Sequence, residues 1–209
     1  LFFFIGFVVA AQIGGRILDR EGAKRAVVLG AVIAAVGYGV WASKVMTLSF
    51  SQQQIWIIVA GAGMGMLIGP ANTDAVSRAS SLSYGEATGI TQTVRNFGAS
   101  LGLAALGTIL LFNFRSELTT TFREKGYPNP GSLANKFSEE QQGGTGTNVG
   151  SIPHYVSVDF AHATSVVLYV MCGVMAFAGV VALFGLERGR QEEPALELEE
   201  TPRATTGAG

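Results

Sequence analysis

Two charged side chains stand inside long apolar stretches of this sequence. Asp74 lies about one helical turn from the end of the stretch 54–76, and Arg95 lies about two turns into the stretch 86–113. A charge within a bilayer is costly unless it is paired, hydrated or able to reach the interface. If the two stretches are antiparallel helices, these residues can pair, either as a fixed clamp or as part of a gate or proton-coupling element. Three amide side chains could share the same interior: Asn72, Gln92 and Asn96.

A second polar set, His154, Asp159 and His162, lies near the start of the last apolar stretch. Asp159 and His162 are three residues apart and share a face if the final helix starts early. They could relay protons or bind a metal, although polar capping at the membrane interface explains them as simply. Because no nucleophile, metal-ligand set or pair of acids gathers at one depth, the sequence predicts no metal, cofactor or catalytic residue.

The most specific pattern is the segment 15–25, GRILDREGAKR. It fits G-x-x-x-[DE]-[RK]-x-G-x-[RK]-[RK] at every specified position: Gly15, Asp19, Arg20, Gly22, Lys24 and Arg25. Gly15 would permit close helix approach and Gly22 a turn with positive φ. Asp19 could offset arginine charge or cap a helix, while the final basic pair would hold a helix end at the lipid surface. An ordinary basic turn explains the cations but not two glycines and an acid at this spacing.

This pattern resembles the cytoplasmic loop signature of major facilitator superfamily transporters, which lies between the second and third helices of a six-helix half. Four apolar stretches follow it here, as the resemblance requires for a C-terminal half from its second to its sixth helix. G-x-G-x-G-x-x-x-G-P at 61–70 and T-x-T-x-R-x-x-G-x-x-x-G at 91–102 resemble, more loosely, the last helices of fourteen-helix drug:proton antiporters. The resemblance therefore implies a major facilitator fold.

The function implied by this resemblance is proton-coupled efflux of drugs or other amphipathic small molecules. Its partners would be the small-molecule substrate, protons, the lipid bilayer and the missing N-terminal half of the same transporter. Sparse charge favours an apolar, permissive cavity. A transporter of a defined metabolite, such as a sugar or organic acid, stays open as an alternative. A non-transport scaffold or sensor would leave the loop pattern unexplained.

The helices that must position these residues are visible as charge-free runs. The chain has 48% hydrophobic and only 14% charged residues, whereas soluble domains carry about 25% charged residues. Since a spanning helix needs about 20 mostly apolar residues, the sequence predicts an all-α membrane protein. The five expected helices cover residues 1–17, 26–43, 54–76, 86–113 and 161–185. The first run is interpreted as a helix cut short, so the natural chain is expected to be longer.

Glycines recur at four-residue spacing in two of these helices. Gly61, Gly65 and Gly69 precede Pro70, and Gly98 and Gly102 follow Arg95. Small residues at this spacing let helix backbones touch in lipid, and Pro70 removes one backbone hydrogen bond. These surfaces either pack permanently or slide as a transporter alternates. Because the glycines and polar residues of 86–113 share one face, that face is expected to point inward, Arg95 included.

Basic residues set the expected orientation. Lysine and arginine cluster in the short loops near residues 16–25, at Arg78 and after the last helix, which places these and the C-terminus in the cytoplasm of a cell-membrane protein. The expected parts are helices in 1–113, a long extracytoplasmic loop at 114–160, a final helix at 161–186 and a disordered cytoplasmic tail at 187–209. The long loop is expected to begin with an ordered stub that continues the fourth helix and then to become flexible. The net charge of −1 gives no nucleic-acid footprint.

Overall fold

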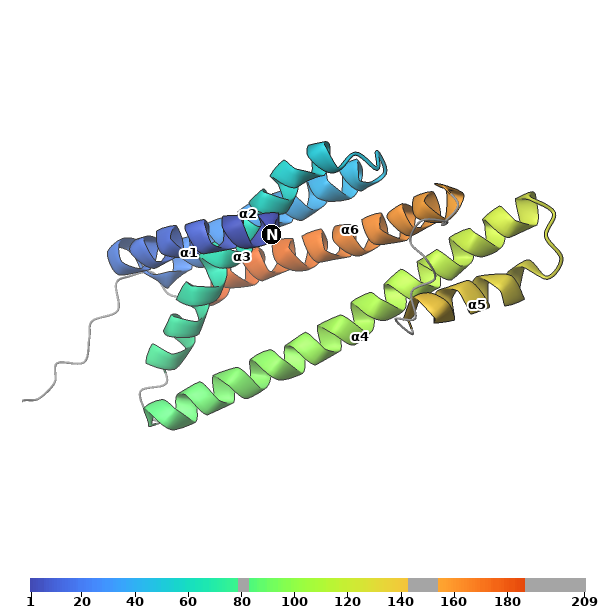
Figure 1. Ribbon diagram of the computed structural model, residues 1–209. Helices are drawn as coiled ribbons and strands as arrows, with labels where there is room; N and C mark the ends of the chain where they lie inside the picture. Colours follow the sequence, from blue (N-terminus) through green and yellow to red (C-terminus); the bar gives the residue numbers. More distant parts are fainter. Residues whose placement is uncertain (79–82, 143–153, 187–209) are drawn as a thin grey trace, which may run out of the picture.

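The computed structural model describes residues 1–78, 83–142 and 154–186. Within these ranges the chain forms α-helices and no β-strand, as the sequence predicts (Figure 1). The helices are α1 (Phe2–Glu21), α2 (Ala23–Val45), α3 (Phe50–Ser77), α4 (Tyr84–Glu124), α5 (Pro130–Gln142) and α6 (His154–Gly185). All except α5 are long and apolar enough to cross a membrane. The expected tail, 187–209, lies outside the described residues.

Large apolar side chains lie on the outside of the long helices. Phe4 and Val8 on α1, Val36 on α2 and Phe177 on α6 each expose half or more of their surface. Such continuous apolar exposure is unusual for a soluble protein. Lipid chains are the solvent that these surfaces suit, because an α-helix pairs its backbone polar groups within itself along its length.

Helices α1, α2, α3 and α6 gather into a bundle, with α2 in extensive contact with both α3 and α6 (Figure 1). α4 runs obliquely to this bundle, and α5 lies beside its later half. α4 also packs against α6, but its contact with α3 is the least extensive of the helix pairs that touch within the described residues. The first half of α4 therefore stands apart from most of the bundle.

Glycines bring α3 against two neighbours at once. A Cβ added at Gly61 or Gly65 would collide with the backbone of α1, and one added at Gly63 would collide with the backbone of Ala34 on α2. In return, Gly6 and Gly14 of α1 lie against the backbone of α3. Only glycine fits at such contacts, because the backbones leave no room for a side chain.

The region expected to be a loop, 114–160, is helical over much of its length. α4 continues to Glu124 rather than ending near residue 113, and α6 begins at His154 rather than near 161. The extension packs through Phe114, Leu118 and Phe122, which are buried on one face at four-residue intervals. The prediction of an ordered stub after residue 113 gave no length for it, although the four-residue apolar interval is typical of an amphipathic helix.

α5 is the helix that the sequence analysis missed altogether. Asn129 has a φ of 56°, and the chain turns there so that Pro130 opens the helix, a position that suits the fixed φ of proline. Ala134 is buried in the same apolar cluster as Phe114 and Leu118. Arg115 Nε donates to Ser138 Oγ at 2.8 Å, which fastens α5 to α4.

Candidate functional site

The segment 15–25 forms the end of α1, a one-residue turn and the start of α2. Gly22 makes the turn with a φ of 86°, and its N–H donates to Leu18 O. Arg25 Nη1 and Glu21 Oε2 form an exposed ion pair at 2.9 Å across the turn. This geometry fits the turn role expected of Gly22. The side chains of Arg16, Asp19 and Arg20 are exposed beside it.

Two expected roles in this segment need correction. Gly14, not Gly15, makes the close helix contact, because a Cβ at Gly14 would meet Met66 of α3 whereas one at Gly15 meets open space within the described part of the chain. Asp19 does not cap α2, whose first turn receives no side-chain cap. Asp19 is therefore an exposed charge on the last turn of α1. Lys24 is half-buried at the start of α2.

Asp74 has a different ion-pair partner from the expected Arg95. Arg78 Nε lies 2.8 Å from Asp74 Oδ2, one turn along the same helix. The Asp74 side chain is buried, and that of Arg78 is partly exposed. Asn72 is half-buried nearby on α3. The pair therefore belongs to the end of α3, and the predicted α3–α4 clamp is wrong for this arrangement.

Arg95 is exposed, together with the polar face on which it lies. Gln92 Nε2 donates to Asn96 Oδ1 at 3.3 Å along that face. Gly98 and Gly102 meet open space within the described ranges. The structure thus assembles the polar face of α4 as predicted by its helical period but brings no other described helix onto it.

Gly69 and Pro70 complete the set of predicted packing residues. Gly69 has open space around it in the part of the chain that the structure describes. Pro70 is fully buried inside α3. The close packing on α3 therefore involves the Gly61–Gly65 part of the glycine series and not its last member.

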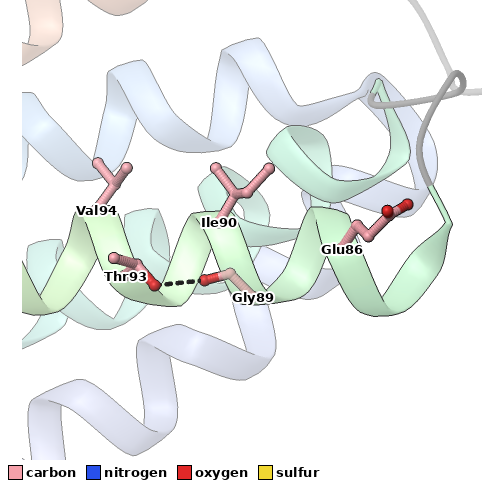
Figure 2. Close-up of a pocket in the computed structure, with 5 residues that line it drawn as sticks. All are labelled: Glu86, Gly89, Ile90, Thr93 and Val94. Carbon is pink, nitrogen blue, oxygen red and sulfur yellow. Dashed lines mark hydrogen bonds between the residues drawn. The ribbon is translucent and has the colours of Figure 1, made fainter.

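A hollow of about 430 Å³ lies along the first turns of α4, lined by Glu86, Gly89, Ile90, Thr93 and Val94 (Figure 2). The Thr93 hydroxyl donates to Gly89 O at 2.8 Å and is thereby held against its own helix. All five lining residues come from one helix, and the hollow is open. The hollow does not include the predicted polar residues Gln92, Arg95 and Asn96. It is an open surface of α4 alone.

The α4 extension supplies functional groups that the sequence analysis did not connect with Asp159 and His162. Thr121 Oγ1 donates to Asp159 Oδ1 at 3.2 Å, and His162 Nε2 lies 3.5 Å from Glu117 Oε1. The four-residue spacing of Glu117 and Thr121 was the available signal, because it places both on one helical face. No group of three or more potential metal ligands occurs among the described side chains. The side chain of His154 falls outside them.

Comparison with known proteins finds relatives named as transporters. The chain is 27% identical over 150 residues to a triacylglyceride transporter of Mycobacteroides abscessus, covering 67% of this chain and 29% of the relative. It is 23% identical over 211 aligned positions to the tetracenomycin C resistance and export protein of Streptomyces glaucescens, covering 97% and 39%. A triacylglyceride transporter of Mycobacterium tuberculosis is 29% identical over 129 residues, covering 56% and 25%.

The chain therefore spans well under half the length of these relatives. No family model matches it, and no solved structure matches significantly. Five apolar helices of membrane-spanning length, together with relatives named as transporters or exporters, indicate a multi-pass membrane protein.

Proposed function

We propose that this chain is part of a secondary active transporter of the major facilitator type that exports drugs or other amphipathic small molecules in exchange for protons. One observation carries the proposal: the alignment to the tetracenomycin C resistance and export protein extends over 97% of the chain. The loop pattern at the α1–α2 turn supports it. Gly22 adopts the positive φ that this pattern requires of its second glycine.

The polar face of α4 supports the further proposal that another part of the same transporter completes the substrate cavity. Gln92, Arg95 and Asn96 are exposed on that face, and a polar, charged face is costly against lipid. In transporters built from repeats, substrate binds near mid-membrane where the repeats meet. The face is therefore proposed to meet the N-terminal half of the transporter and to line a partly hydrated cavity. The protein is proposed to lie in a cell membrane with its C-terminus in the cytoplasm.

Neutral lipid is a second candidate cargo. Two of the relatives named above are described as triacylglyceride transporters. The hollow on α4 is lined mostly by apolar surface of Ile90 and Val94, which suits an apolar cargo. A sugar or organic acid, the alternative from the sequence, has no comparable support.

The test is transport by the full natural chain in proteoliposomes with an imposed proton gradient. We expect a lipophilic cationic dye to be carried against its concentration gradient while protons move in the opposite direction. A protonophore, which dissipates the proton gradient, should stop dye accumulation. A fluorescent triacylglyceride in the same vesicles separates the lipid candidate from the drug candidate. Transport that ignores the proton gradient, or transport of hydrophilic metabolites alone, would contradict the proposal.

A further inference from the structure

The Glu124 end of α4 and the His154 end of α6 are joined by an ionisable cluster. This cluster, here named the α4–α6 tip, consists of Glu117 and Thr121 on α4 and of Asp159 and His162 on α6. Two polar contacts cross between the helices, Thr121 to Asp159 at 3.2 Å and His162 to Glu117 at 3.5 Å. Neither contact belongs to the polar face of α4 or to the α1–α2 turn.

Asp159 is the member of the tip whose surroundings are incomplete. Its exposed fraction is 7%. Oδ1 accepts from Thr121, whereas the buried Oδ2 has no hydrogen-bond partner among the described residues. An ionised carboxylate needs donors at both oxygens, and burying one without them is costly. The geometry therefore suits a carboxyl group that holds a proton on Oδ2.

The charges around Asp159 favour the same state. Glu117 and Glu124 on α4 act on it with negative charge, and His162 is the cation former that acts on it from α6. His162 lies against Glu117. Lys125 Nζ lies 4.6 Å from the centre of the Tyr155 ring, over its aromatic face. An ionised Asp159 would add a third carboxylate to two existing ones.

Apolar packing keeps water from this carboxyl group. Phe114, Leu118 and Phe122 of α4 and Val156 of α6 belong to one buried apolar cluster, on the same stretches of the two helices as the contact. The ring of Phe160 packs edge-on against that of Phe114, with centroids 5.5 Å apart. The helices thus close over Asp159, and hydrating an ionised Asp159 would require them to part.

We propose that the α4–α6 tip is a proton-binding site centred on Asp159 and that loss of this proton separates the two helix ends. The ligand is a proton taken from water, which adds to Oδ2, and its release leaves a carboxylate that draws water between α4 and α6. The contact between His162 and Glu117 is a second link between α4 and α6, and binding of the proton to Asp159 does not depend on it. The inference concerns this contact alone and holds whichever cargo the protein carries.

The test measures the distance between spin labels at Thr120→Cys on α4 and Ser157→Cys on α6, in the full natural chain with Cys172→Ser, in lipid nanodiscs. We expect a short, narrow distance at about pH 5, which lies above the ordinary aspartate pKa of about 3.9, and a longer, broader one at about pH 9. Asp159→Asn, which stays neutral, should keep the short distance at both. His162→Gln, which removes the histidine as an alternative titrating group of the tip, should still lengthen the distance at the higher pH.

Equal distances at both pH values in the protein without a tip substitution would overturn the inference, and this comparison needs no variant at the site. A persisting response in Asp159→Asn, or loss of the response in His162→Gln, would also overturn it, because another group would then be titrating. The measurement uses no cargo, so its outcome is separate from the outcome of the transport assay.

Discussion

Asp74 is a buried charge whose ion-pair partner comes from its own helix. Its pair with Arg78 spans one turn at the end of α3, where the arginine reaches partly into solvent. Sequence spacing alone could not choose between this partner and Arg95. Arg78 lies outside the apolar run, whereas Arg95 lies inside one, where a charge is costly without a partner. The sequence therefore favoured Arg95 as the partner of Asp74. An i, i+4 pair costs less chain ordering than a pair between helices, because both groups are already on one face.

Replacing Arg78 should therefore destabilise the protein more than replacing Arg95. Arg78→Ala removes the 2.8 Å pair from a buried carboxylate, and we expect a loss of about 1–2 kcal/mol, discounted because the arginine is partly exposed. Thermal unfolding in detergent measures it. Adding Asp74→Asn to Arg78→Ala should recover part of the loss, whereas Arg95→Ala alone should shift the midpoint little. Equal losses for the two alanine variants would show that Arg95 is also tied into the fold.

The α1–α2 turn allows a second test at single residues. Gly22→Val forces a β-branched residue into φ 86° and ψ 167°, a region adopted almost only by glycine, which strains the turn by about 1–3 kcal/mol. Asp19→Asn removes only an exposed charge. On the proposed function, both should reduce dye export while most of the protein stays in the membrane. Arg16→Gln, which removes an exposed charge at an unspecified position of the pattern, is the matched control and should export normally. Normal export by the first two variants would remove any role of this turn in transport.

At the scale of helices, α3 is the element around which the bundle is built. It presents Gly61 and Gly65 to α1 and Gly63 to α2, so both neighbours reach its backbone. The four-residue glycine series indicated one such surface, but the second one depends on Gly63, which has small partners on α2 rather than a series of its own. A one-dimensional pattern could not show which neighbour each glycine meets.

The glycine series of α3 offers a test with an internal control. Gly65→Leu would drive a large side chain into the backbone of Phe7, whereas Gly69→Leu would enter open space within the described residues. We expect Gly65→Leu to lower stability by about 1–3 kcal/mol or to prevent folding, and Gly69→Leu to have little effect. Gly65→Ala keeps the comparison measurable if the leucine variant does not fold. Similar unfolding temperatures for both leucine variants would mean that α1 does not pack here.

The ends of the helices were harder to predict than their existence. Charge-free runs indicated five spans, because a bilayer excludes charge over a nearly fixed length. Beyond the bilayer that rule stops, and the α4 extension follows the spacing of Phe114, Leu118 and Phe122 instead. The tip contact between Thr121 and Asp159 depends on that extension. Because the predicted stub after residue 113 had no stated length, the sequence did not place Thr121 and Glu117 on a helix beside Asp159.

At the scale of the whole molecule, α4 has two kinds of surroundings. Its later half packs against α5 and α6 around a buried cluster, while its first half exposes both Arg95 on the polar face and Phe97 on the apolar one. The relatives are two to four times longer than the part matched here. On the proposed function, one of these exposed faces meets lipid and the other meets the rest of the transporter, and only sequence beyond this chain can identify the covering helices.

The orientation of the whole molecule is the most far-reaching prediction, because every proposed role of the two ends depends on it. Basic residues gather at the α1–α2 turn and at Arg78, and such clusters stay in the cytoplasm. Because α4 crosses the membrane once between Arg78 and the α4–α6 tip, α5 and the tip are expected outside the cell.

Cysteine at Ser132, exposed on α5, should therefore react with a membrane-impermeant maleimide in intact cells, whereas cysteine at Ser77, exposed at the end of α3, should react only after the cells are opened. Both variants carry Cys172→Ser so that the one cysteine of this sequence does not compete. Reaction of both sites from outside would mean that α4 does not cross the membrane, and the reverse pattern would place the tip in the cytoplasm, where it would sense cytoplasmic rather than external protons.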